Sequence, residues 1–329
     1  MECELVSQKR DMLFLFFLNI TGGRSELAIK AKNLEKSFDG KKVLNDISFS
    51  VKKGEVFGYL GPNGAGKTTT VRILTGLIKP DRGEVFVCGR NVSKEPVKVR
   101  EKIGILPEVS NVYPDLTAWQ NLMLASQLYG LEKKVAEKRG EKLLKEFGIY
   151  GVKNSKVKTF SKGMKQKLMF CMALISEPEV IFLDEPTSGL DVASARMLRE
   201  KILEMKDLGT TVFLTSHNMS EVDVLCDKVA IIKGGKIIAK DTPDGIKELV
   251  GGSVAVEVKF ENGFGNGVEL SKLRGKKAGD RYVIYTTDPN ETICQIVEFA
   301  KKKRVRIISI NTRSPSLEDA FLKILGEIV

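Results

Sequence analysis

Cysteine is scarce in this chain of 329 residues, and its spacing argues against two kinds of structure. The five cysteines lie far apart and include no C-x-x-C pair; they are Cys3, Cys88, Cys171, Cys226 and Cys294. Structural zinc sites and disulfide frameworks need cysteines at close or regular spacing. The sequence therefore indicates neither, and it fits a protein of the reducing cytosol.

Long apolar runs and internal repeats are also missing. The run at residues 12–20 follows Lys9 and Arg10 and superficially resembles a secretion signal. It is too short to cross a bilayer, which takes about 20 apolar residues in a helix. We therefore expect residues 1–26 to be a disordered extension or the product of an upstream start codon, with a weak interfacial anchor as the alternative.

The charges are unbalanced, with 53 basic and 42 acidic residues and a net charge of +11. Such an excess suits nucleic acid, an anionic membrane surface, or simply a lysine-rich soluble protein. The basic run at residues 301–306 has no RNA-binding aromatic motif beside it. We interpret this run as a solvated helix end that leads into a strand.

The strongest signal is the glycine-rich loop GPNGAGKTT at residues 61–69, which matches G-x-x-x-x-G-K-[ST]. An apolar strand at 55–60 precedes it, and Val71, Leu74, Leu77 and Ile78 follow at helical spacing. In such loops backbone N–H groups wrap around phosphates, the lysine reaches the β- and γ-phosphate oxygens, and the hydroxyl binds Mg²⁺. The sequence therefore predicts a bound nucleoside triphosphate. Its predicted contacts are Gly61, Pro62, Asn63, Gly64, Ala65, Gly66, Lys67, Thr68 and Thr69, with Thr68 also on Mg²⁺ and Lys67 also catalytic.

Two apolar runs, 180–183 and 211–215, are typical of parallel strands that are buried on both faces. Asp184 and Glu185 follow the first run, and His217, the only histidine, follows the second. Because the carboxyl ends of parallel strands form the ligand edge of a doubly wound sheet, we expect these side chains beside the phosphate loop. Asp184 would hold Mg²⁺, Glu185 would deprotonate the attacking water and His217 would contact the γ-phosphate. The alternatives are a solvated acidic turn and a structural histidine.

The stretch FSKGM at residues 160–164 precedes an amphipathic helix at 165–174. Ser161 suits the N-cap of that helix, where its hydroxyl and the neighbouring amides can face an anion. Taken alone, the stretch indicates only the start of a helix.

Together these motifs resemble the nucleotide-binding subunit of ABC transporters, and the resemblance covers residues 27 to about 244. GPNGAGKTT resembles the Walker A loop, IFLDEP the Walker B strand with its glutamate, SGLD with Asp191 the D-loop, and TSH the switch histidine. In that family two subunits face head to tail, which makes Ser161 and Gly163 the signature residues that cover the partner's γ-phosphate. The resemblance also makes Phe38 the aromatic that stacks on adenine, with a core phenylalanine as the alternative.

Two departures from the family pattern point to a subgroup. ILPE ends in Glu108 where the Q-loop normally has glutamine, and a carboxylate there can still bind Mg²⁺ while adding negative charge. The consensus signature L-S-G-G-Q is altered at Phe160, Lys162 and Met164. With the stretches at 116–122 and 316–322, these changes resemble the ATPases of ABC-2 type exporters, including drug-export and sodium-extrusion systems.

The expected fold is α/β: a P-loop NTPase with a doubly wound core, an N-terminal antiparallel β subdomain and an inserted helical subdomain at about 94–158. This ATPase domain would span residues 27–246. A small C-terminal α+β domain would follow at 247–329, with strands at 253–260, 281–286 and 305–310 and helices at 291–302 and from 317.

The resemblance implies a motor that hydrolyses ATP with Mg²⁺, pairs with a second ATPase subunit, most simply its own copy, and drives a separate permease from the cytoplasmic face of the membrane. We expect the permease to dock near residues 108–129. The alternative is a soluble ABC ATPase that acts on nucleic acid or the ribosome, which only the positive charge favours. Long coiled coils, zinc cysteines and a second nucleotide domain, which such proteins use, are missing, so we expect no specific nucleic-acid partner. A non-catalytic regulatory subunit is disfavoured by Glu185 and His217.

Overall fold

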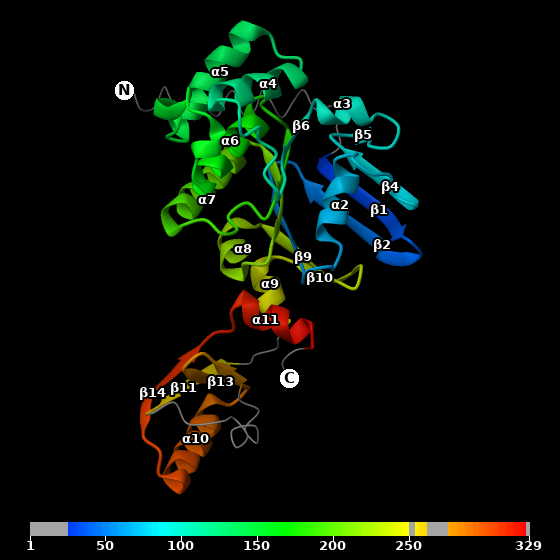
Figure 1. The fold of residues 1–329 in the computed structure, drawn as a ribbon. Helices are drawn as coiled ribbons and strands as arrows, with labels where there is room; N and C mark the ends of the chain where they lie inside the picture. The colour runs from blue at the N-terminus through cyan, green and yellow to red at the C-terminus, as the bar shows by residue number, and fades with distance from the viewer. Residues whose placement is uncertain (1–25, 250–253, 262–275, 327–329) are drawn as a thin grey trace, which may run out of the picture.

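The computed structural model describes residues 26–249, 254–261 and 276–326, which form three sheets with helices around them (Figure 1). The predicted extension therefore lies outside the described residues, apart from Glu26. Within the described ranges no helix combines the length and the apolar character that a membrane span requires.

The first sheet is an antiparallel subdomain at the start of the chain. Strands β1 (Leu27–Phe38) and β2 (Lys41–Lys52) form a long hairpin around Asp39 and Gly40, which both have positive φ, and β4 (Arg82–Val87) and β5 (Arg90–Asn91) complete the order β2-β1-β4-β5. This confirms the predicted antiparallel β subdomain.

The second sheet is the core, in the order β10-β9-β3-β8-β7-β6. Its strands are β3 (Val56–Leu60), β6 (Ile103–Leu106), β7 (Val180–Asp184), β8 (Thr211–Ser216), β9 (Lys228–Lys233) and β10 (Lys236–Asp241). All neighbours pair in parallel except β10 with β9. Every residue of β3, β7 and β8 is buried, as expected for parallel strands covered on both faces. The predicted doubly wound core is confirmed.

Aromatic rings join the first two sheets. Phe49 of β2 stacks on Phe57 of β3 with ring centroids 5.5 Å apart, and it also contacts Tyr59 and Phe213. Such pairs contribute about 0.5–1.5 kcal/mol beyond the area that they bury. The antiparallel sheet is thereby fixed to the strand that leads into the glycine-rich loop.

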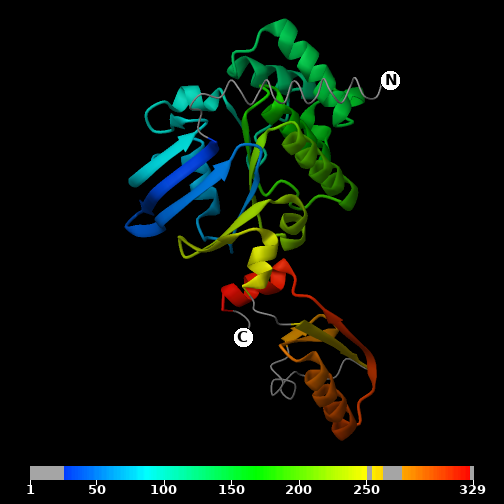
Figure 2. The same cartoon turned by 180° about the vertical axis from the view of Figure 1, so that it is seen from behind.

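Helices cover the core sheet and form the inserted subdomain (Figures 1 and 2). They are α2 (Lys67–Leu74), α3 (Pro96–Arg100), α4 (Ala118–Leu128), α5 (Lys133–Glu146), α6 (Lys162–Leu174), α7 (Val192–Asp207), α8 (Met219–Leu225) and α9 (Pro243–Glu248). Ser161 caps α6, as predicted.

Two predicted helical ranges differ in detail from the observed elements. α2 ends at Leu74 although the apolar spacing continues to Ile78, because Gly76 takes a left-handed conformation with φ +71° that ends the helix. The range 94–158 contains β6, which pairs with β7 at the edge of the core sheet. A short apolar run such as IGIL fits a strand or a helix equally well by periodicity, and pairing with a distant strand decides between them.

The third sheet lies in the C-terminal part, in the antiparallel order β12-β13-β11-β14. Its strands are β11 (Val254–Phe260), β12 (Lys276–Ala278), β13 (Arg281–Thr286) and β14 (Ile307–Arg313), and α10 (Pro289–Lys303) packs on them. The predicted elements are present, while β12 was not predicted. Lys301, Lys302 and Arg304 are exposed at the end of α10, so the basic run does lie at a helix end, as predicted.

The last helix, α11 (Leu317–Ile324), packs mainly on α8 and α9, the helices beside the core sheet. Leu317 and Ala320 are buried in the same apolar cluster as Ile246 of α9, and Lys233 of β9 donates a hydrogen bond to the carbonyl of Leu325. The expected range 247–329 for the small domain therefore included a helix that packs elsewhere. The apolar face of α11 gave no indication of its partner.

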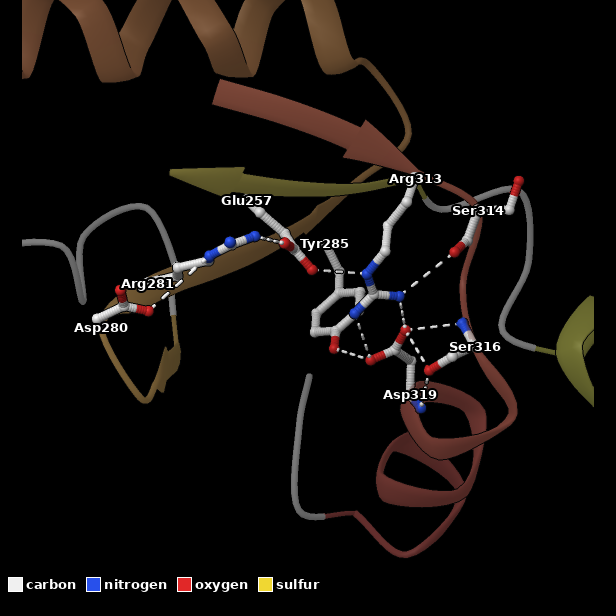
Figure 3. A network of polar contacts seen from close by, with 8 residues as sticks. All are labelled: Glu257, Asp280, Arg281, Tyr285, Arg313, Ser314, Ser316 and Asp319. Atoms are coloured by element: carbon white, nitrogen blue, oxygen red, sulfur yellow. Dashed lines mark hydrogen bonds and ion pairs between the residues drawn. The ribbon is translucent and has the colours of Figure 1, made fainter. Parts of the chain in front are cut away.

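A polar network ties α11 back to the third sheet (Figure 3). Arg313 of β14 donates hydrogen bonds to Asp319 of α11 and to Glu257 of β11, and the Tyr285 hydroxyl also donates to Asp319. Burial acts to raise the pKa of Asp319, but the hydrogen bonds from Arg313 and Tyr285 outweigh it and hold the pKa at about 2. α11 thus connects the third sheet to the helices that cover the core sheet.

Candidate functional site

The glycine-rich loop lies between β3 and the N-terminus of α2. Gly61 is required there, because a Cβ at this position would lie 2.4 Å from the carbonyl oxygen of Ile232. Gly64 and Gly66 have φ of +78° and +109°, which residues with a side chain rarely adopt. Pro62, Asn63 and Gly64 are exposed, whereas Ala65, Gly66 and Lys67 are buried. The loop therefore presents free backbone N–H groups at a helix N-terminus, which is the geometry of a phosphate cradle.

The Lys67 side chain folds back onto the start of this loop. Its side chain is 8 % exposed, and its Nζ donates to the Gly61 carbonyl at 2.7 Å and lies 3.8 Å from Glu185 Oε1. Thr68 and Thr69 follow in the first turn of α2 and are half-buried. The structure thus brings together Lys67, which follows β3, and Glu185, which follows β7, as predicted.

Glu185 lies between Lys67 and His217 at the carboxyl edge of the sheet. Its side chain is 8 % exposed, and Oε2 is 2.7 Å from His217 Nδ1, whose ring is largely exposed. The backbone of Glu185 has φ +52°, a left-handed conformation that is disfavoured for a residue with a side chain. Strain of this kind collects at functional sites, where the surrounding structure holds it.

Asp184 is the last residue of β7 and is 4 % exposed. Its Oδ1 accepts a hydrogen bond from the Thr215 hydroxyl, which in turn accepts one from the Glu185 N–H at 3.1 Å. Glu108 is exposed and follows β6, whose Leu106 pairs with Leu183, so both carboxylates lie at the same sheet edge. α2, which carries Thr68, packs on β7.

This donor set fits Mg²⁺. Within the described ranges no group of three or more His, Cys, Asp or Glu side chains gathers as a metal cluster. Mg²⁺ binds through one or two carboxylates and completes its shell with water and substrate phosphates, so a single carboxylate such as Asp184 is sufficient.

A second group of predicted residues lies at two other helix N-termini. The Ser161 hydroxyl accepts from the Met164 N–H at 3.2 Å at the start of α6, and Asp191 accepts from the Ser194 N–H at 2.8 Å at the start of α7. The hydrogen bonds from Ser194 lower the pKa of Asp191. A Cβ on Gly163 would lie 2.9 Å from Ser194 Oγ, so the glycine lets the two helix starts approach.

This second group does not join the first. Ser161 and Asp191 are exposed, and among the described residues no hydrogen bond or ion pair links either of them or Gly163 to the glycine-rich loop. Both helix starts carry partial positive charge that faces outward.

Phe38 lies at the tip of the β1–β2 hairpin and is 45 % exposed, so the alternative of a core phenylalanine is wrong. Its ring contacts Lys36, whose Nζ is 5.4 Å from the ring centroid. The same hairpin reaches the loop: a Cβ on Gly66 would lie 3.1 Å from the carbonyl oxygen of Val43. The ring is therefore accessible on the subdomain that borders the loop.

Sequence reasoning missed the groups that hold these residues in place. Thr215 joins Asp184 to Glu185, and Gln166 of α6 donates to the carbonyl of Pro186 at 2.8 Å. A hydroxyl inside the apolar run 211–215 was the only available signal for Thr215. Nothing in the sequence near Gln166 points to Pro186.

A glycine-rich loop between a parallel strand and a helix, with an acidic pair at the same sheet edge, defines a P-loop nucleoside triphosphatase. The family model described as ABC transporter matches residues 44–188. The chain is 34 % identical over 307 residues to the linearmycin resistance ATP-binding protein LnrL of Bacillus subtilis, covering 91 % of this chain and 98 % of that protein. It is 36 % identical to the daunorubicin resistance ATP-binding protein DrrA2 of Streptomyces coeruleorubidus, over 91 % of this chain and 95 % of that protein.

Among solved structures, a dimeric bacterial ABC transporter cassette, MJ0796, superposes with a TM-score of 0.61 at 26 % identity, over 65 % of this chain and 98 % of that chain. The chain belongs to the family of ABC transporter ATP-binding proteins. The predicted family and the predicted ATPase class are thereby confirmed, and the nucleic-acid alternative receives no support from these relatives.

Proposed function

We propose that this chain is the ATP-hydrolysing motor of an ABC-2 type exporter, in which two copies close on ATP and drive a separate permease. The observation that carries the proposal is the buried Glu185 carboxylate, 3.8 Å from Lys67 and 2.7 Å from His217 beside the glycine-rich loop. The names of the two relatives, linearmycin resistance and daunorubicin resistance, support export as the direction of transport.

The residues at this edge divide the chemistry of phosphoryl transfer. Backbone N–H groups of residues 61–69 would hold the phosphates, Lys67 would balance charge on the γ-phosphate, and His217 would contact it. Glu185 would orient the attacking water and accept its proton. Phe38 would stack on the adenine.

Thr68, Asp184 and Glu108 would supply the protein ligands of Mg²⁺. When bound, the ion neutralises charge on the phosphate oxygens. Asp184 is prepared for this position because the Thr215 hydroxyl fixes one of its oxygens. Glu108 is exposed and brings a further negative charge, which distinguishes this edge from one that carries glutamine.

Lys67 also explains how the site responds to ATP. In the structure its ammonium is shared between the Gly61 carbonyl and Glu185. A triphosphate carries more negative charge than either of these partners, and the attraction between opposite charges grows with their size. Binding would therefore draw Lys67 to the phosphates and leave Glu185 free to act on water.

The second group of residues supports a second ATPase subunit as partner, most simply another copy of this chain. Ser161, Gly163 and Asp191 stand at helix starts that suit an anion, and no hydrogen bond among the described residues joins them to their own loop. In a head-to-tail pair they would complete the partner's nucleotide site. The related cassette MJ0796 has been solved as a dimer.

An apolar cavity supports the docking of a permease near residues 108–129. Its volume is about 750 Å³, and it opens between the core and the helical subdomain. Large apolar side chains line it, among them Leu77, Val97, Tyr113, Leu124 and Leu128. Leu128 is 80 % exposed and Val97 is 64 % exposed, which is unusual unless a partner covers them. The chain would then work at the cytoplasmic face of the membrane.

Turnover by a Glu185→Gln variant tests the proposal. The amide keeps the size of the side chain but cannot accept the proton, so ATP should still bind while hydrolysis falls at least a hundredfold. Glu200→Gln is the matched control, because Glu200 is 57 % exposed on α7 and, in the part of the chain that the structure describes, pairs with Arg196. Retained hydrolysis in Glu185→Gln would show that Glu185 is not the general base.

A further inference from the structure

Glu221, in the first turn of α8, is a buried carboxylate that none of the roles above uses. It is 1 % exposed. Its Oε2 accepts a hydrogen bond from the Thr187 hydroxyl at 2.8 Å and one from the Ser216 hydroxyl at 3.3 Å, while Oε1 is buried with no partner among the described residues. Leaving a buried polar atom unpaired is unfavourable. Packing alone therefore does not explain why a carboxylate is buried at this position.

Helix capping does not supply that reason. Glu221 is the third residue of α8 after the N-cap Asn218, and in a capping box its side chain would bond the N-cap N–H. Here the Asn218 N–H donates to Ser216 Oγ instead, at 3.0 Å. An acidic residue that served only the helix dipole would not need burial, because it is stabilising on the surface as well.

The two hydroxyl partners lie directly beside the reacting residues. Thr187 follows Glu185 by two positions, and Ser216 immediately precedes His217. Glu221 therefore joins the segment that leaves β7 to the end of β8. Its contacts link the backbone neighbours of the two side chains that face the γ-phosphate in the proposed function.

The same segment is held from its other side by the helix of the second group. Gln166 of α6 donates to the Pro186 carbonyl at 2.8 Å. Pro186 and Thr187 are thus bonded both to the helix that starts at Ser161 and to the helix that follows His217. From Thr187 the chain runs on to Asp191 at the start of α7.

We propose that Glu221 is a positioning residue that couples two parts of one subunit: the residues that act on the γ-phosphate and the helix start that faces the partner. By holding Thr187 and Ser216 it fixes the segment 186–191 against the switch histidine, so that Glu185, His217 and the partner-facing Asp191 keep one geometry. The inference rests on the proposed function, because it assumes the roles of these three residues. Burial raises the pKa of Glu221 and the two hydroxyl bonds oppose this rise, so the hydroxyls stabilise the charged acceptor.

The first test removes one donor at constant shape. Thr187→Val should lower kcat for ATP about tenfold, which corresponds to about 1.4 kcal/mol, with KM changed less than about twofold. Thr187→Ser keeps the hydroxyl and should retain wild-type turnover. Wild-type turnover in the valine variant together with a loss in the serine variant would show that the methyl group packs and the hydroxyl does nothing, which would overturn the proposal.

The second test places both partners in a cycle. Glu221→Gln replaces the charged acceptor and puts an amide nitrogen where no acceptor lies. Its kcat should therefore fall, as in Thr187→Val. The double variant should be no slower than the slower single variant, because both changes break one interaction. Asp223→Asn is the control on the same helix, since Asp223 pairs with Lys247, and its turnover should be unchanged. Additive losses would contradict the coupling.

The variants are compared a second time in a Glu185→Gln background, by ATP-dependent dimerisation of the full chain. Here Thr187→Val should raise the ATP concentration for half-dimerisation about tenfold, and Thr187→Ser should leave it unchanged. If Glu185→Gln alone is inert but Thr187→Val behaves as wild type in both assays, the inference about Glu221 fails and the proposed function stands. If Glu185→Gln itself turns over, the proposed function fails.

Discussion

Thr215→Val tests the placement of the acidic pair most specifically. Thr215 is fully buried in β8, and its hydroxyl donates to Asp184 Oδ1 while accepting the Glu185 N–H. The valine side chain has almost the same shape and removes both bonds. The Glu185 N–H keeps the Thr215 carbonyl as a second acceptor at 3.2 Å, so the loss falls mainly on Asp184.

A hydrogen bond to a charged group contributes about 1.5–3 kcal/mol. We therefore expect the free energy of unfolding to fall by about 2 kcal/mol. Because every 1.4 kcal/mol of transition-state stabilisation is a factor of ten in rate, kcat should fall at least tenfold. The measurements are urea unfolding and steady-state ATP hydrolysis at saturating Mg²⁺.

Thr211→Val is the matched control, at the opposite end of the same strand. Thr211 is equally buried, and its hydroxyl accepts the Gly54 N–H at 3.0 Å, away from the glycine-rich loop. This variant should lose about 1 kcal/mol of stability and keep full turnover per folded molecule. If Thr215→Val hydrolysed ATP as fast as Thr211→Val, the hydroxyl would have no part in positioning Asp184.

Three further predictions concern other parts of the chain. Gly61→Ala should abolish ATP binding in an equilibrium titration, because its Cβ would lie 2.4 Å from the Ile232 carbonyl. The Cβ of Gly64→Ala meets no atom within 4 Å, so this variant should lose only about 1 kcal/mol of binding free energy, for its φ of +78°. Equal losses of binding in the two variants would refute the steric argument. Asp319 has a pKa lowered to about 2, below the value of about 3.9 of an unfolded chain, so its stabilisation is present above about pH 4 and is lost as the pH falls through 2. Acid unfolding monitored by circular dichroism should show this loss, and Asp319→Asn should remove it; an unchanged acid transition in that variant would contradict the assignment. Leu128→Lys, at an 80 % exposed position, should abolish co-purification of a membrane partner and leave the basal ATPase rate unchanged, whereas retained co-purification would place the docking surface elsewhere.

The sequence predicted the parts of the fold that local patterns determine. The glycine-rich loop, the buried strands β7 and β8 and the cap at Ser161 each depend on residues that are close along the chain. β6 and α11 were misplaced because their partners lie far away in sequence: β6 pairs with β7 and α11 packs on α8 and α9. An apolar face shows that a partner exists and does not identify it.

The same distinction holds in the site. Lys67, Glu185 and His217 were predicted because each stands at the end of a recognisable strand or loop, and the structure brings them together. Glu221 and Gln166 were missed because each acts on a segment that is distant in sequence, through a single side-chain contact. Such contacts leave no periodicity or spacing in the sequence.

We propose that two copies of this chain complete each other's nucleotide sites, and the mass of Glu185→Gln in solution tests this most directly. Light scattering on a sizing column should give a monomer without nucleotide and a dimer with ATP and Mg²⁺. Adding Ser161→Arg to this variant should return it to a monomer, because the arginine would block the outward-facing start of α6. A chain that stays monomeric at saturating ATP, or a dimer that is indifferent to Ser161, would contradict the account.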